Sequence, residues 1–193
     1  MIQLVRQGDE ENSMDTHIEK SMPYSVHAVA NEILRQARDM ELDITHLKLQ
    51  KLVYLAHALH LAIKKTPLIA EDVQAWKYGP VIKELYDSCS KYGSEPITDN
   101  LSLKKESGKK VVNVKPVVSR NQAIENLVNA VLKRYGHLDG GQLISLTHEK
   151  GSAWSVLEEY HKGGAVRDSV IPVELIGEAE GKHLLSEEYL SRV

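Results

Sequence analysis

The chain has 193 residues, a formal net charge of −3 and one cysteine, Cys89. This length fits a single domain with tails, and the near-neutral charge argues against a dedicated nucleic-acid binder, which usually has a strong basic excess. One cysteine excludes an internal disulfide and a zinc site with several thiolate ligands. No apolar run approaches the roughly 18 residues that span a bilayer, and the first residues lack the plan of a signal peptide. The composition therefore predicts a soluble cytoplasmic protein that does not enter membranes.

Two helices are expected in the first third of the chain, after an acidic leader. Residues 1–22 contain few apolar side chains, which predicts that they are flexible. From Ser25, a good N-cap, apolar residues recur at the i, i+3, i+4, i+7 spacing of an amphipathic helix. A second helix should follow the capping residue Thr45 and run to about Lys65, because Pro67 prevents its continuation. Apolar residues cover most of its circumference, so we expect it to be central in the domain.

A third helix is predicted to begin where two aromatic rings and a Gly-Pro pair lie within five positions. Gly79 can cap a helix, and the fixed φ of Pro80 suits a first turn. A helical apolar face follows, and Gly93 stands where a helix C-terminus favours glycine. The rings of Trp76 and Tyr78 do not follow from this pattern, and they could be core anchors or a recognition surface.

A β-hairpin is predicted over residues 99–116. Apolar residues and lysines lie on both sides of a turn-like segment in its middle, Glu106–Lys109. These lysines, with Arg120 nearby, could contact nucleic-acid phosphates. We favour an edge hairpin whose lysines prevent pairing with other strands, because the chain as a whole is acidic. We do not expect nucleic acid to be the partner.

Capping residues predict the remaining helices, with starts at Ser119, Asp139 and Ser152, the first of them stopping at Gly136. After a break at Gly163-Gly164, a weaker helix is expected over Pro172–Glu180, with one or two further turns over Ser186–Arg192. We therefore expect a mainly α fold, a compact single-domain helical bundle of about six to eight helices with one inserted β-hairpin. Its parts are the leader (1–22), the helical domain (23–163) and a C-terminal helical extension (164–193).

No catalytic or metal-binding constellation stands out. His57 and His60 lie at a spacing that can place two imidazoles near one metal, but further ligands would have to come from distant residues such as His148. The sequence contains no HExxH, GxSxG, P-loop or GxGxxG motif. Cys89 lies at a position expected to face the core, which favours an inert thiol. We therefore assign no catalytic residue, no metal site and no cofactor.

Three polar side chains, Gln50, Tyr54 and His57, fall on one stripe of the second helix. On a mostly apolar helix they must find hydrogen-bond partners or face solvent, since each unmet buried group would cost about 1–3 kcal/mol. We favour an internal network that joins this helix to its neighbours over catalysis. A recognition surface is the second interpretation.

Several motifs occur together in chain order, and they are Leu49-Gln50-Lys51-Leu52-Val53-Tyr54, Pro67-Leu68, Ala75-Trp76-Lys77-Tyr78-Gly79-Pro80-Val81, Leu85-Tyr86 and Tyr92-Gly93. A second block contains Leu143, Leu146-Thr147-His148 and Ser152-Ala153-Trp154. Over about residues 25–160 this pattern resembles the signature of the Panacea domain, the SocA-like, phage-associated antitoxin family. That family often has proline at the position of Ala153, so the second block departs from its pattern there.

The resemblance implies a mainly helical antitoxin of a type II-like toxin–antitoxin pair. It would neutralise a cognate protein toxin, encoded by the adjacent gene, through direct protein–protein binding. The alternatives are an adaptor that delivers the toxin to a cytoplasmic protease, a DNA-binding regulator and a metal-dependent enzyme. A signature shared by proteins with different partners describes a scaffold, so we expect toxin specificity in the leader, the hairpin and the C-terminal segment. The signature or candidate interaction residues are Gln50, Lys51, Tyr54, Trp76, Tyr78, Gly79, Pro80, Tyr86, His148 and Trp154.

Overall fold

The computed structural model describes residues 23–104, 111–113, 116–117, 121–161 and 169–185. Several sequence predictions fall outside these residues, namely those for the leader, the hairpin turn, the break at Gly163-Gly164 and the last turns after residue 185. Within the described residues there are seven α-helices, so the predicted mainly α fold is confirmed. No helix in this part of the chain is both long and apolar enough to cross a membrane.

The first two helices begin at the predicted caps. Helix α1 spans Val26–Asp39, and the hydroxyl of Ser25 accepts a hydrogen bond from the backbone N–H of the third residue after it. Helix α2 spans His46–Lys64, is capped in the same way by Thr45, and ends at Lys65 in the left-handed conformation. Both predictions are confirmed because capping is a local property of the chain.

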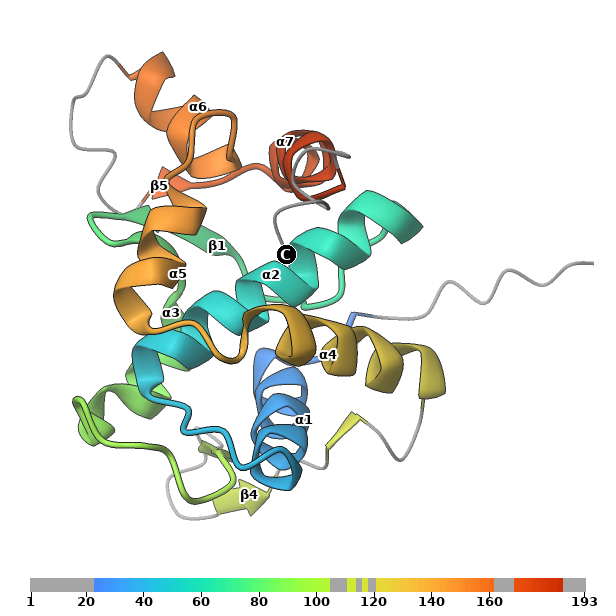
Figure 1. Ribbon diagram of the computed structural model, residues 1–193, viewed down its shortest axis with the longest axis vertical. Coiled ribbons are helices and arrows are strands. Elements are labelled where there is room, and N and C mark those ends of the chain that lie inside the picture. The colour runs from blue at the N-terminus through green and yellow to red at the C-terminus, as the bar shows by residue number, and fades with distance from the viewer. Residues whose placement is uncertain (1–22, 105–110, 114–115, 118–120, 162–168, 186–193) are drawn as a thin grey trace, which may run out of the picture.

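Helix α2 lies at the centre of the fold, as its apolar circumference predicts. It contacts α1, α4, α5, α7 and strand β2. In Figure 1 it crosses the middle of the molecule, with α1 and α4 on one side and α7 on the other. Helix α2 therefore provides the surface on which these elements pack.

The predicted helix start at Gly79-Pro80 is wrong. Strand β1 (Val73–Trp76) pairs antiparallel with strand β2 (Gly79–Ile82), and helix α3 (Lys83–Cys89) begins only after the second strand. A single turn of 3₁₀ helix, Ser90–Tyr92, follows α3.

Local signals explain this error, because a Gly-Pro pair suits an edge strand as well as a helix start. Lys77 and Tyr78 form the turn, and Gly79 follows it with a φ of 94° that favours glycine. Pro80 pairs with Ala75 at the edge of the sheet, where its missing N–H removes no ladder hydrogen bond.

Strand β1 also pairs antiparallel with strand β5 (Ser169–Val170), which gives a sheet in the order β2-β1-β5 that the sequence did not predict. The predicted hairpin is a second, separate sheet. It consists of strands β3 (Ser102–Lys104) and β4 (Val111–Asn113), which pair antiparallel.

The later helices agree with prediction except at the start of α4 and the end of α7. Helix α4 spans Gln122–Tyr135 and has Asn121 as its N-cap, so the predicted start at Ser119 is wrong. The Asn121 side chain accepts hydrogen bonds from two backbone N–H groups of the first turn, at 3.0 and 3.4 Å. Asparagine caps a helix as well as serine does, and Asn121, two positions after Ser119, therefore sets the start of α4.

The last three helices are α5 (Gly140–Thr147), α6 (Ala153–Tyr160) and α7 (Val173–Leu184). A capping box between Asp139 and Gln142 starts α5, and Ser152 caps α6, as expected. Helix α7 packs across α2, and it extends beyond the predicted end at Glu180. The second half of the chain thus folds back onto the central helix.

Candidate functional site

Side chains of α2 bond the outer edge of β2 in place of another strand. Gln50 donates from Nε2 to the carbonyl of Ile82 (3.1 Å), and the N–H of Ile82 donates to Gln50 Oε1 (3.0 Å). Lys51 donates from Nζ to the carbonyl of Pro80 (3.0 Å). We call these four residues the α2–β2 clasp.

The chemistry of the clasp matches the groups that it satisfies. Ile82 presents a donor and an acceptor, and the amide of Gln50 supplies one of each. Pro80 has only a carbonyl, and the ammonium of Lys51 is only a donor. The clasp therefore explains structurally why the Gln-Lys and Gly-Pro motifs occur in the same chain.

Lys51 is completely buried, and its amino group occupies the space that a side chain at position 79 would need. Burial lowers the pKa of Lys51 to about 7, because the interior disfavours the charged form. A Cβ atom on Gly79 would lie 2.7 Å from Lys51 Nζ and 2.8 Å from the hydroxyl of Thr147. It would also lie 3.0 Å from the ring of His148. The first residue of β2, Gly79, thus packs directly on α2 and on the end of α5.

Aromatic contacts join the β1–β2 hairpin to α6 and α3. The indole N–H of Trp154 donates to the carbonyl of Trp76 (2.9 Å), and the ring of Trp154 lies 3.8 Å from that of His148, between centroids. The ring of Trp76 in turn lies 5.0 Å from that of Tyr86. The two sequence blocks of the signature therefore meet at this hairpin.

Tyr54 has a different partner from the clasp residues. Its hydroxyl donates to Glu180 Oε1 (2.6 Å), which also accepts the backbone N–H of Ala153 (3.0 Å). Burial raises the pKa of Glu180, and burial together with this carboxyl raises the pKa of Tyr54. Sequence reasoning missed Glu180, although it lies four positions after Ile176 on the buried stripe of α7, where a charged residue is unusual.

His57 and His60 each bond backbone groups near the end of α2. His57 Nδ1 accepts the N–H groups of Leu68 (3.3 Å) and Ile69 (3.4 Å), and burial lowers the pKa of His57 to about 4. His60 Nδ1 donates to the carbonyl of Thr66 (2.8 Å). The polar row of α2 therefore forms internal hydrogen bonds that hold three different parts of the chain.

Two further observations concern catalysis and metal binding. Among the described residues no three or more His, Cys, Asp or Glu side chains gather at one point. Cys89 is fully buried, and burial raises its pKa to about 12, so the thiolate nucleophile does not form at neutral pH.

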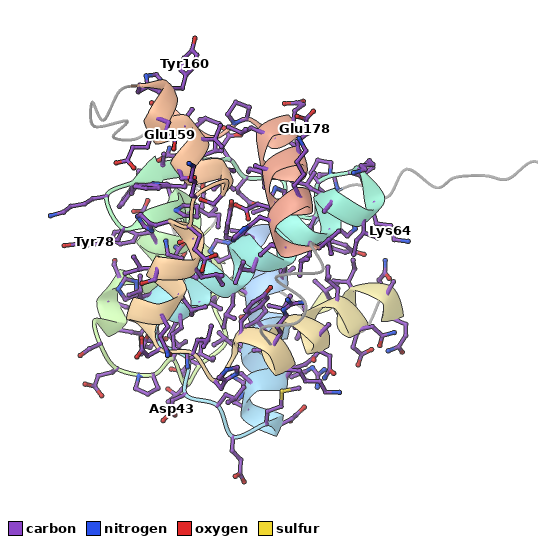
Figure 2. The ribbon with its side chains drawn as sticks, turned by 45° about the horizontal axis from the view of Figure 1, so that its top comes forward. Asp43, Lys64, Tyr78, Glu159, Tyr160 and Glu178 are labelled. Carbon is purple, nitrogen blue, oxygen red and sulfur yellow. The ribbon has the colours of Figure 1, made fainter. Side chains whose placement is uncertain are left out.

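Beside the clasp lies an open groove of about 850 Å³. Four rings line it, those of His46, Trp76, Tyr78 and Tyr86, together with the aliphatic residues Leu47, Val81 and Ile144 and the polar residues Gln50 and Lys77. We call it the aromatic groove. Tyr78 projects from the surface in Figure 2 and is 59% exposed. Of the candidate residues, Tyr78 is exposed and four are partly exposed, namely Trp76, Tyr86, His148 and Trp154. The other five are buried, namely Gln50, Lys51, Tyr54, Gly79 and Pro80.

The segment that contains the clasp and the β1–β2 hairpin also matches a known family of domains in sequence. Residues 49–155, more than half of the chain, match the family described as "Antitoxin SocA-like, Panacea domain", and this chain belongs to that family. The chain is also similar to "Antitoxin SocA" of Caulobacter vibrioides (strain NA1000 / CB15N), with 36% identity over 139 residues. The similarity covers 70% of this chain and 72% of the relative. No solved structure matches the chain.

Proposed function

We propose that this protein is the antitoxin of a type II-like pair, and that it neutralises a cognate protein toxin in the cytoplasm by direct binding. The observation that carries the proposal is membership of the SocA-like antitoxin family, together with 36% identity to an antitoxin. The toxin is expected to be the product of the adjacent gene.

The use of the signature side chains supports binding rather than turnover. Gln50, Lys51 and Tyr54 are buried and bonded within the fold, so they are not available to a substrate. The bonds of Gln50 and Lys51 hold the β1–β2 hairpin, which presents the aromatic side chain of Tyr78 at the surface. A protein of this kind acts through the shape of its surface, and a stable complex would bury at least about 1,200 Å² in total. We propose that it has no enzymatic activity of its own.

Co-expression tests this function. The adjacent open reading frame is placed under an inducible promoter, with and without this protein, and growth and co-purification are followed. We expect the neighbour to be toxic alone, and growth to be restored together with a complex that survives purification. A harmless neighbour, or one that stays toxic beside this protein, would contradict the proposal.

The same experiment separates occlusion of the toxin from its delivery to a protease. If the protein occludes the toxin, the toxin persists in the rescued cells as part of the complex. If growth is restored while the toxin level falls and no complex is recovered, the adaptor alternative is supported instead. Toxin half-life after a translation block distinguishes the two results.

A further inference from the structure

The aromatic groove is preformed, because its walls are fixed from several sides. The backbone carbonyl of Trp76 accepts a hydrogen bond from the indole N–H of Trp154 (2.9 Å). The indole Nε1 of Trp76 donates to Gln74 Oε1 (2.9 Å). The ring of Tyr86 lies 5.0 Å away on the other side, between centroids. Ordered side chains lose little conformational entropy on binding, and a groove of about 850 Å³ accommodates several side chains of a partner.

The charge of the groove is positive, in contrast to the chain as a whole. The chain has 27 acidic and 24 basic residues, yet the residues that line the groove include no Asp or Glu. Lys77 is exposed and forms no ion pair with any described residue. Its Nζ lies 5.4 Å from the centre of the Tyr78 ring. Burial lowers the pKa of His46, so its imidazole is neutral near pH 7 and Lys77 carries the charge.

We propose that the aromatic groove receives an acidic-apolar segment of the partner toxin. A bulky apolar side chain packs against the rings of Trp76 and Tyr78, and a neighbouring carboxylate pairs with Lys77. Tyr78 is 59% exposed at the rim, and tyrosine and tryptophan are among the residues that most often dominate binding energy. The inference rests on the proposed function, because it assigns a surface and a chemistry to the same partner.

The wild-type complex with the adjacent gene product is compared with two groove variants, Tyr78→Ala and Lys77→Glu. Two matched controls, Tyr160→Ala and Lys64→Glu, change exposed residues that Figure 2 shows at other ends of the molecule. All four substitutions are at exposed positions, so equal melting temperatures will show that the fold is intact. We expect each groove variant to bind about tenfold or more weakly, and both controls to bind as the wild type does.

The chemistry of the partner is tested at the same position. Lys77→Arg keeps the charge and is expected to bind within about threefold of the wild type, whereas Lys77→Glu repels a carboxylate. If Tyr78→Ala weakens the complex but Lys77→Glu does not, the acidic part of the proposal is wrong. If both groove variants bind like the wild type, the groove is not the interface, although the proposed function stands.

Two further outcomes separate this inference from the function on which it rests. If the isolated chain is a dimer in gel filtration and Tyr78→Ala makes it monomeric, the groove joins two copies, and the proposal is overturned. If the wild type does not bind the neighbouring gene product at all, the proposed function has failed. In that case, short random displayed peptides are selected on the wild-type protein to test which peptides the aromatic groove binds. Enrichment of acidic-apolar peptides that is lost in Tyr78→Ala supports the inference, and no such enrichment overturns it.

Discussion

At the scale of single residues, Gly79 has both a φ that favours glycine and no space for a side chain, whereas Gly151 has only the first of these properties. Gly79 and Gly151 have almost the same φ, 94° and 95°, but a Cβ on Gly151 would meet nothing within 4 Å. Any other residue at either position therefore has a strained backbone, whereas only position 79 also lacks space.

We predict that Gly151→Ala lowers the free energy of unfolding by about 1–2 kcal/mol, the cost of a left-handed non-glycine residue. Gly79→Ala should lose a further 1–3 kcal/mol or so, because its methyl group would overlap the buried Lys51 and Thr147. Urea denaturation of both variants measures the difference. Equal losses would show that Lys51 and Thr147 move aside without cost.

The clasp makes a second prediction at this scale. Gln50→Ala removes the partner of both backbone groups of Ile82, and it should lower the free energy of unfolding by about 2–4 kcal/mol. Gln122→Ala is the control, since Gln122 is exposed and bonds Asn126 on its own helix. Its effect should stay within about 0.5 kcal/mol. A loss below about 1 kcal/mol in Gln50→Ala would mean that water replaces the amide at the sheet edge.

At the scale of elements, one carboxyl group joins three helices. Glu180 of α7 accepts the hydroxyl of Tyr54 from α2 and the first N–H of α6, at Ala153. The contact belongs to the interface of α7 with α2, where Gly177 and Gly181 face Leu61 and Ala62. The position of α7 therefore depends on a polar contact as well as on apolar packing.

Tyr54→Phe removes only the hydroxyl, and we expect it to lower the free energy of unfolding by about 1.5–3 kcal/mol, as for hydrogen bonds to charged groups. The substitution should increase the rate of amide hydrogen exchange more in α7 than in α1, because the lost bond anchors α7. Tyr160→Phe, at a residue that is 80% exposed, is the control. Unchanged exchange in α7 would contradict an anchoring role for Tyr54.

At the scale of the whole molecule, Lys51 couples stability to pH. Its pKa is about 7 in the folded protein, against an ordinary value of 10.5. Between these values the unfolded chain holds a proton that the folded chain has released. Stability therefore rises with pH across this interval, by at most about 1.4 kcal/mol per pH unit.

We predict that the free energy of unfolding rises from about pH 7 to 8.5, and that Lys51→Met removes this rise. The window ends there because Cys89, whose pKa burial raises from 9.0 to about 12, acts in the opposite sense at higher pH. Lys64→Met, at an exposed position, is the control and should keep the slope. Chemical denaturation at several pH values measures it, and equal slopes in the wild type and Lys51→Met would contradict the assignment.

The sequence by itself determined the starts of four helices, the central place of α2 and the family. Ser25, Thr45, Asp139 and Ser152 each cap the helix that follows them, because a cap is satisfied by backbone groups only two or three residues away. The central position of α2 followed from its apolar circumference in the same local way. The motifs between residues 49 and 155 were enough to recognise the antitoxin family.

Only the tertiary structure decided what Gly79-Pro80 does and which partners the signature side chains have. The pair suits a helix start and an edge strand equally, and the choice depends on β1 and on side chains of α2 that are about 30 residues distant in sequence. The bond between Tyr54 and Glu180 spans 126 positions, and the aromatic groove is formed by segments from α2, the hairpin, α3 and α5. These contacts depend on how distant segments pack together, which local periodicity and capping do not specify.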